Sequence, residues 1–214
     1  YEVTYGDPVF KIAANAEDTE SGIHFTSDNE NVTTVSADGT VTIKNAGTAK
    51  ITVSMDESQN FLAVSKEVTV TVAPKEITVT PDNASKVYGE SDKEFTYTPS
   101  GLVGEDTLSD ITLSRAEGDN VGTYEITAAQ KKNANPNYSV KFNKGTFTIN
   151  PKEITVTITP NGGTYEGNII SAAAVLNGLV GEDKPEIILT YAGKANDGTE
   201  VNGTKTPVLA GTYT

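Results

Sequence analysis

Two pairs of adjacent carboxylates, Glu105-Asp106 and Glu182-Asp183, are the first residues in this sequence that could do chemistry. Two carboxyl groups held together can act as general acid and general base, as in glycoside hydrolysis. Each pair, however, follows the same Gly-Leu-Val-Gly, and adjacent residues on a strand point to opposite faces. The sequence therefore favours two exposed turns in equivalent positions and predicts no catalytic residue and no enzyme.

Oxygen donors that could hold a metal ion are concentrated near the start of the chain. Glu17–Glu20 and Asp28–Asn31 are clusters of acids and amides in predicted loops. Ca²⁺ takes about six to eight oxygen ligands, but no EF-hand spacing is present. We therefore predict a solvated acidic surface without cofactor or metal, and keep Ca²⁺ as the alternative. The single histidine, His24, lies between Ile23 and Phe25 in an alternating pattern, which predicts a half-exposed strand residue rather than a ligand.

Tyrosine side chains could stack on sugars. Tyr5, Tyr88 and Tyr165 recur at similar places along the chain, which favours packing in a core or at an edge. Tyr191 lies in a region with no such counterpart. We therefore name Tyr191 as the candidate binding residue, within a contact surface at Tyr191–Thr206.

The composition indicates which elements must position these residues. The chain has 214 residues, among them 31 Thr, 20 Val and 14 Ile, with 19 Gly and 9 Pro. β-Branched side chains are stiff at χ1 and suit a pleated surface, while Gly and Pro supply turns. We therefore predict a soluble, globular, all-β protein.

Charge and residue usage exclude several classes of function. The net charge is −13, with Arg115 as the single arginine, so a phosphate backbone would be repelled and we predict no nucleic-acid binding. The absence of Cys removes thiolate metal sites and disulfides. No apolar run approaches the roughly 18–20 residues that cross a bilayer, so we predict no membrane insertion. The sequence starts at Tyr1 without a signal-like segment, and we interpret it as an internal part of a longer protein.

Internal repetition defines the organisation of the chain. Pro74–Thr80 recurs unchanged as Pro151–Thr157, and Gly101–Asp106 recurs as Gly178–Asp183, both with an offset of 77 residues (151 − 74 and 178 − 101). Chance does not generate several matches in one register. We therefore predict three units, at residues 1–73, 74–150 and 151–214.

The junctions between the units lie directly between strand patterns, without a flexible Gly/Ser linker. Period-2 alternation predicts the strands of the first two units. These strands are Val9–Ala13, His24–Thr26, Thr33–Ser36, Thr40–Lys44, Ala49–Ser54, Glu67–Val72, Glu76–Thr80, Phe95–Thr98, Ile111–Arg115, Gly122–Thr127, Tyr138–Phe142 and Thr146–Ile149. Short joints between strands predict a semi-rigid array.

The third unit departs from the second in two ways. The spacing between equivalent Gly-Thr-Tyr segments is 89 residues (211 − 122) rather than 77, which predicts an inserted loop or hairpin around Lys194–Thr206. The sequence also stops at Thr214, shortly after the last of these segments, so we predict a third unit that lacks its last strands. Ile169–Leu176 is predicted as a strand, with a short helix as the alternative.

Two families resemble these units. Phe25–Val53 resembles a bacterial Ig-like group 2 domain, with Thr33 where that family has a small alanine. The second unit is similar to the MBG domains of bacterial surface proteins, and the third is a divergent copy with Glu166 in place of Gly89. The residues that carry the MBG resemblance are Val87–Gly89, Phe95–Tyr97, Ser100–Leu108, Val121–Tyr124 and Asn137-Tyr138.

The resemblance implies a tandem array of Ig-like β-sandwich domains in a secreted or cell-surface bacterial protein, with no shared catalytic residues. Our leading hypothesis is a non-enzymatic stalk. The alternatives are an adhesin module that binds a glycan or protein of a host or neighbouring cell, and an accessory module of a secreted carbohydrate-active enzyme. The partner itself stays unknown at this point. An internal isopeptide bond from Lys75 or Lys86 to Asn143 or Asn150 is a further alternative, which the intact mass would test.

Overall fold

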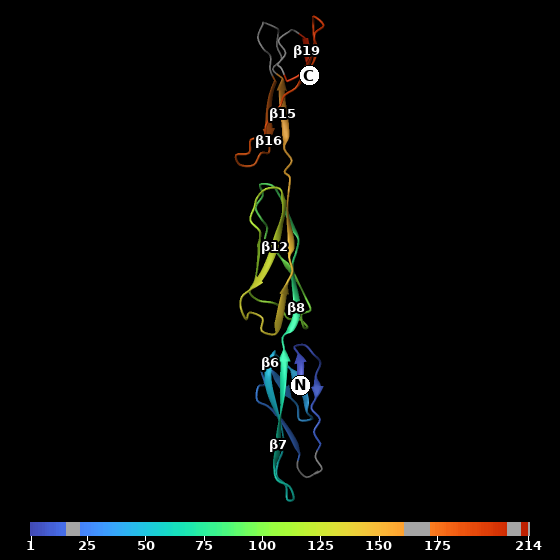
Figure 1. The fold of residues 1–214 in the computed structure, drawn as a ribbon, viewed down its shortest axis with the longest axis vertical. Helices are drawn as coiled ribbons and strands as arrows, with labels where there is room; N and C mark the ends of the chain where they lie inside the picture. Colours follow the sequence, from blue (N-terminus) through green and yellow to red (C-terminus); the bar gives the residue numbers. More distant parts are fainter. Residues whose placement is uncertain (16–21, 161–171, 205–210, 214) are drawn as a thin grey trace. The chain divides into compact units, whose positions relative to one another are not determined.

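The β-branched composition produces strands along the whole computed structural model, which describes residues 1–15, 22–160, 172–204 and 211–213. Every regular element among these residues is a β-strand, so the predicted all-β class is confirmed (Figure 1). None of the described segments is a helix long and apolar enough to pass through a bilayer.

The chain forms two compact units. The first consists of Tyr1–Ala84, Glu94–Glu117 and Thr123–Phe147, and the second of Ser85–Lys93, Gly118–Gly122 and Thr148–Thr214. The three-unit division at residues 73 and 150 stays a prediction, and we use "first", "middle" and "third repeat" below for the predicted units.

Two sheets are built from the first repeat. Its strands are β1 (Glu2–Thr4), β2 (Phe10–Lys11), β3 (Ile23–Ser27), β4 (Thr33–Val35), β5 (Thr40–Ile43), β6 (Gly47–Met55) and β7 (Val64–Ala73). They pair in the orders β1-β7-β6-β3 and β2-β5-β4. Strands β6 and β7 lie side by side over nine antiparallel residue pairs, from Gly47↔Val72 to Met55↔Val64 (Figure 1), whereas β1 runs parallel to β7.

The alternating apolar residues of these strands form one buried cluster. Its members, all at most 6% exposed, are Ile12, Val32, Val41, Ala49, Ile51, Val70 and Val72. Four of them alternate along β6 and β7, Val41 lies on β5 of the other sheet, and Ile12 and Val32 lie next to the ends of β2 and β4. The period-2 pattern of β6 and β7 therefore corresponds to their inward face. Burial of apolar area on these faces is the main contribution to the stability of this part of the chain.

Thr33 on β4 carries an unusual cost within this core. The residue is 0% exposed, and its Oγ1 has no hydrogen-bond partner in the described part of the chain. A buried polar atom without a partner costs about 1–3 kcal/mol. We therefore expect Thr33→Val, which keeps the shape and removes the hydroxyl, to raise the free energy of unfolding by about 1 kcal/mol. Urea unfolding tests this, and a variant that is less stable than the parent would show that Oγ1 has a partner.

The middle repeat supplies the next set of strands. These are β8 (Lys75–Pro81), β9 (Ala84–Val87), β10 (Tyr97–Ser100), β11 (Ile111–Arg115), β12 (Gly122–Gln130), β13 (Tyr138–Phe142) and β14 (Gly145–Asn150). They pair in the orders β10-β8-β13 and β11-β12-β14-β9, with β13 parallel to β8. A single residue, Pro74, separates β7 from β8, which fits a residue that cannot donate to a sheet ladder.

The described strands of the third repeat are β15 (Thr155–Pro160), β16 (Ala172–Asn177), β17 (Tyr191–Ala195), β18 (Glu200–Gly203) and β19 (Gly211–Tyr213). Strand β16 pairs with β15 in antiparallel orientation, so the described part of the predicted strand Ile169–Leu176 is a strand, and residues 169–171 lie outside the described residues. The predicted insertion around Lys194–Thr206 contains the end of β17 and all of β18, which form an antiparallel hairpin, while residues 205 and 206 lie outside the described residues.

Candidate functional site

Two tight turns present tyrosine and glycine in the same geometry. In Thr4–Asp7, the Asp7 amide donates to the Thr4 carbonyl at 2.9 Å, and the Asp7 carboxylate accepts from the Thr4 amide at 2.7 Å. Gly6 stands third in the turn with φ of 88°, which makes it a type II turn. A side chain at this φ is strained, so the turn needs glycine.

The second turn, Val87–Glu90, repeats this design. The Glu90 amide donates to the Val87 carbonyl at 3.0 Å, and the Glu90 carboxylate accepts from the Val87 amide at 3.0 Å. Gly89 has the same φ of 88°. Tyr88 is thereby held in the same place in its turn as Tyr5 in the first.

The repeated Gly-Leu-Val-Gly-Glu-Asp segments form a second kind of turn. In the middle repeat the Asp106 amide donates to the Val103 carbonyl at 3.0 Å, and in the third repeat Asp183 donates to Val180 at 3.1 Å. The intervening glycines, Gly104 and Gly181, have φ of 55° and 56°. Each turn therefore presents one valine and one aspartate side by side.

The first Tyr-Gly turn lies against the first of these segments inside the first compact unit. We call Tyr5, Gly6, Val103, Asp106 and Tyr138 the first tyrosine contact. The Tyr5 and Tyr138 hydroxyls both donate to Asp106 Oδ2, at 2.8 and 2.5 Å, and the Val103 amide donates to the Tyr138 hydroxyl oxygen at 3.0 Å. The two tyrosine rings meet edge to face, with centroids 5.5 Å apart.

Burial and the aspartate together keep both phenols protonated. Desolvation, followed by the hydrogen bond to Asp106, raises the pKa of Tyr138 to about 12. The same two causes raise the pKa of Tyr5 above its ordinary value. A phenol that stays protonated and donates to a carboxylate is a structural group, not a general base at neutral pH.

Asn137 extends the first tyrosine contact. Its Oδ1 accepts from the Ala46 amide and its Nδ2 donates to Asn45 Oδ1, both at 2.8 Å. Asn45 and Ala46 lie just before β6. Asn137 of the middle repeat therefore bonds to two residues of the first repeat.

A second tyrosine contact, formed by Tyr88, Gly89, Val180 and Asp183, lies inside the second compact unit. The Tyr88 hydroxyl donates to Asp183 Oδ1 at 3.3 Å. That hydrogen bond and the charge of Asp183 raise the pKa of Tyr88. A cleft of about 390 Å³ borders Tyr88, Val180 and Asp183. Among the described residues, no tyrosine takes the place beside Asp183 that Tyr138 takes beside Asp106.

These contacts correct our interpretation of the first carboxylate pair. We predicted an exposed turn at Glu105-Asp106, but Asp106 is half-buried and accepts two phenolic hydrogen bonds, while Glu105 is exposed. The two tyrosines that bond to Asp106 are 101 and 32 residues away along the chain, so the local sequence around Asp106 does not indicate them. In the other pair, Glu182 and Asp183 are both exposed.

The predicted metal ligands are not brought together among the described residues. Glu17–Glu20 lies outside the described part of the chain. Asp28 accepts from the Lys50 amide at 2.6 Å, and no group of three or more acidic or histidine side chains suited to a metal occurs among the residues that the structure describes. His24 is 57% exposed on β3, with its Nε2 3.5 Å from Asp56.

Tyr191 begins β17 and is half-buried. It pairs with Gly203 in the hairpin, away from the turn at Asp197-Gly198. Its binding role stays a prediction.

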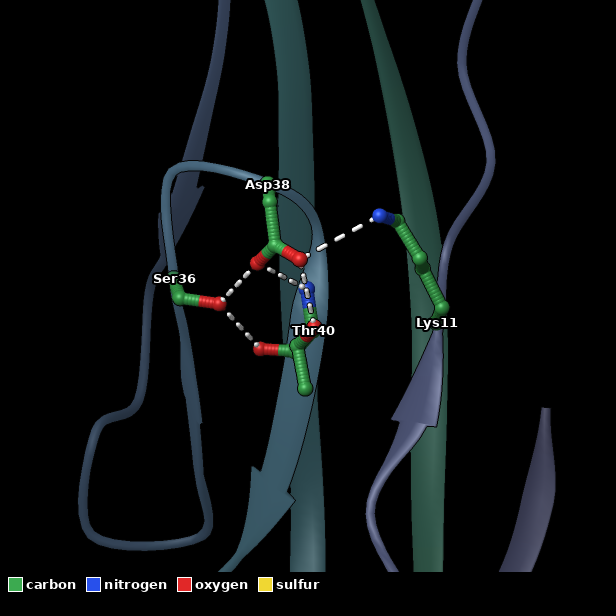
Figure 2. Close-up of polar contacts among 4 residues, drawn as sticks. All are labelled: Lys11, Ser36, Asp38 and Thr40. Atoms are coloured by element: carbon green, nitrogen blue, oxygen red, sulfur yellow. Dashed lines mark hydrogen bonds and ion pairs between the residues drawn. The ribbon is translucent and has the colours of Figure 1, made fainter.

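A further carboxylate, Asp38, closes the turn between β4 and β5 (Figure 2). Its oxygens accept from Ser36 Oγ at 2.6 Å, from Thr40 Oγ1 at 3.0 Å and from Lys11 Nζ at 3.2 Å. The Ser36 hydrogen bond, then those from Thr40 and Lys11, hold the pKa of Asp38 well below its usual range. This carboxylate stays ionised at neutral pH, so its role is to fix the turn rather than to supply a proton.

Lys86 is a buried cation on β9. Its side chain is 6% exposed, and Nζ lies 2.8 Å from Asp92 and 3.5 Å from Asp119. Of the other predicted isopeptide partners, the Asn143 amide donates to Thr80 and the Asn150 amide to the Lys86 carbonyl. The isopeptide alternative stays a prediction.

Comparison with known proteins identifies one domain. Residues 77–148 match the model of the MBG domain (YGX type), a range that contains Tyr88-Gly89 and Gly101–Asp106. The predicted MBG resemblance of the middle repeat is thereby confirmed, while the Ig-like group 2 and third-repeat assignments stay predictions. No curated protein matches the sequence.

Three solved structures are similar to the chain at low identity and low TM-score. Drosophila N-cadherin EC1-3 is 13% identical, over 71% of this chain and 64% of that one, with a TM-score of 0.25. Yersinia pseudotuberculosis InvD is 15% identical, over 99% and 78%, with a TM-score of 0.32. The S-layer protein rSbsC is 17% identical, over 89% and 33%, with a TM-score of 0.29. The chain thus spans less than two thirds of the N-cadherin and rSbsC chains.

Proposed function

We propose that this chain is a non-enzymatic structural segment of a bacterial cell-surface protein, in which successive repeats form a semi-rigid stalk outside the cell. The match of residues 77–148 to the MBG domain supports the class, because the middle repeat resembles domains of bacterial surface proteins. Asp7, Asp38 and Glu90 accept hydrogen bonds within their own turns, and Asp106 accepts two phenolic hydrogen bonds from distant segments, which supports a structural role.

The first tyrosine contact is the observation that carries this proposal. It ties the end of β1 to residues 103–106 and 138, and Asn137 ties the same region to Asn45 and Ala46. Because β7 also runs into β8 through Pro74 alone, the first and middle repeats are joined by both chain and side chains. Such a joint resists bending, which a spacer needs and an independent catalytic domain does not.

Distance measurement between spin labels tests the stiffness of this joint. The chain has no cysteine, so labels can be placed at chosen exposed positions. The pair Lys66→Cys and Lys132→Cys places one label in the first repeat and one in the middle repeat. We expect one narrow distance distribution, as narrow as that of the control pair Lys44→Cys and Lys66→Cys within the first repeat. A distribution several times broader than the control would contradict a semi-rigid stalk.

A binding screen separates the stalk from the adhesin and accessory-module alternatives. We expect the purified chain to show no saturable binding to glycans or extracellular-matrix proteins, with or without Ca²⁺. Saturable binding that Tyr191→Ala abolishes would replace the stalk by an adhesin module and would locate its surface.

A further inference from the structure

The two tyrosine contacts share a Tyr-Gly turn, a valine and an aspartate, and one of them lies in each compact unit. The Tyr-Gly turns are 83 residues apart (88 − 5), whereas the valines and aspartates that they meet are 77 apart (180 − 103 and 183 − 106). The contact therefore does not follow from a fixed spacing along the chain. Two copies that reach the same geometry from different spacings indicate that the turn and the segment recognise each other.

Steric fit is the first part of that recognition. A Cβ added to Gly6 would lie 2.5 Å from Val103 Cγ2, and one added to Gly89 would lie 2.5 Å from Val180 Cγ2. Glycine is thus required twice over, once for the positive φ and once because the valine side chain occupies the space of a Cβ.

A hydrogen bond to an aspartate side chain is the second part of that recognition. The Tyr5 hydroxyl meets Asp106 at 2.8 Å and the Tyr88 hydroxyl meets Asp183 at 3.3 Å. Hydrogen bonds to a charged group are stronger than neutral ones, and the acceptor accounts for tyrosine rather than phenylalanine in the turn. In both copies, the amide of the aspartate donates to the carbonyl of the valine, and this hydrogen bond fixes the turn of the segment.

We propose that the Gly-Leu-Val-Gly-Glu-Asp segment is a docking site for the Tyr-Gly type II turn of the repeat that precedes it. Its valine fits against the glycine and its aspartate binds the phenol. This inference rests on the proposed function and deepens it, since it names the partner of each joint as a turn of defined sequence. The docking also has a fixed order along the chain: the preceding repeat supplies the turn and the following repeat supplies the segment. The first repeat accordingly carries the turn but no such segment.

Backbone hydrogen exchange in the full chain tests the second copy by a double-substitution cycle. We expect Gly89→Ala to speed the exchange of the Asp183 amide by about tenfold or more, since the added methyl group displaces Val180. Adding Val180→Ala makes room for that methyl group and should recover part of the protection. Gly198→Ala is the matched control, because Gly198 has φ of 92° with only Lys194 Cε within 4.0 Å, and it should leave Asp183 unchanged.

The first copy gives a second measurement with its own signature. We expect Gly6→Ala to bring the pKa of Tyr138 down from about 12 toward the ordinary tyrosine value, as followed by NMR of labelled tyrosine rings. The double substitution Thr4→Val with Asp7→Glu, which gives the first turn the residues that flank Tyr88-Gly89, should leave that pKa in place.

Two results would overturn the docking site. One is that Gly89→Ala and Val180→Ala have additive effects on the exchange of the Asp183 amide, and the other is that Gly6→Ala leaves the pKa of Tyr138 unchanged. Either outcome would take the tyrosine contact away from the support for the stalk, which would then rest on the strand connection at Pro74 and on the hydrogen bonds of Asn137 to Asn45 and Ala46, and which the spin-label distances test separately. Conversely, saturable ligand binding in the screen would overturn the stalk and leave this cycle untouched.

Discussion

Replacing Phe147 with alanine is expected to lower the free energy of unfolding of the first compact unit by about 3–5 kcal/mol. Phe147 on β14 is 1% exposed, its ring meets Phe95 edge to face at 5.5 Å, and the Arg115 guanidinium lies 5.0 Å from its centroid. The substitution removes the buried apolar area and leaves a cavity, and it also removes both ring contacts. Because the chain has no tryptophan, urea unfolding can be followed by tyrosine fluorescence.

Phe61→Ala is the matched control for this prediction. Phe61 is 53% exposed, so the same change there should alter stability by only about 0.5 kcal/mol. Equal effects at the two positions would show that Phe147 is not part of a packed core.

Asp92→Ala is expected to destabilise the second compact unit by about 3–5 kcal/mol, because it removes the nearer carboxylate from a buried ammonium. Lys86 keeps Asp119 at 3.5 Å, but the Asp119 side chain is 84% exposed and its charge is screened by water. Asp92, at 2.8 Å and 31% exposed, is the better placed partner. Thermal unfolding of the full chain measures the loss.

Lys86→Met separates the cost of an unpaired charge from the value of the ion pair. Methionine keeps the apolar stem of Lys86 and removes the charge, so we expect a change within about 1 kcal/mol in either direction. Asp92→Ala should also cost much less in the Lys86→Met background. If Lys86→Met destabilises the chain as much as Asp92→Ala does, the pair itself contributes the stability.

Period-2 alternation located most strands of the first two repeats, but it made the long strands β7 and β12 too short and missed two short ones. Both ends of β11 and β13 agree with the predictions at Ile111–Arg115 and Tyr138–Phe142. Strands β1 and β9, of three and four residues, were missed, although β4 and β5 of the same lengths were predicted within one residue. Strand β10 was predicted at Phe95–Thr98 but lies at Tyr97–Ser100; it includes Pro99, which an edge strand tolerates.

The tyrosine contacts could be predicted only in part. The recurrence of Tyr5 and Tyr88 favoured packing at a core or an edge, and the repetition of Glu-Asp after Gly-Leu-Val-Gly was visible as well. That Tyr5 meets Asp106 was not, because the two residues are 101 positions apart and only the folded sheets bring them together. Repetition in a sequence marks a constrained position, but it does not name the contact that constrains it.

The parallel pairing of β8 and β13 decides how the middle repeat responds to tension. A pull applied at Pro74 would draw β8 toward its start, and a pull applied at Asn143, between β13 and β14, would draw β13 toward its end. The five residue pairs from Tyr138↔Lys75 to Phe142↔Val79 are then loaded in shear, so their hydrogen bonds must fail together. The antiparallel β17–β18 hairpin, pulled at its open end, separates one pair at a time. Under rising force, this hairpin therefore yields before the β8–β13 pairing of the middle repeat.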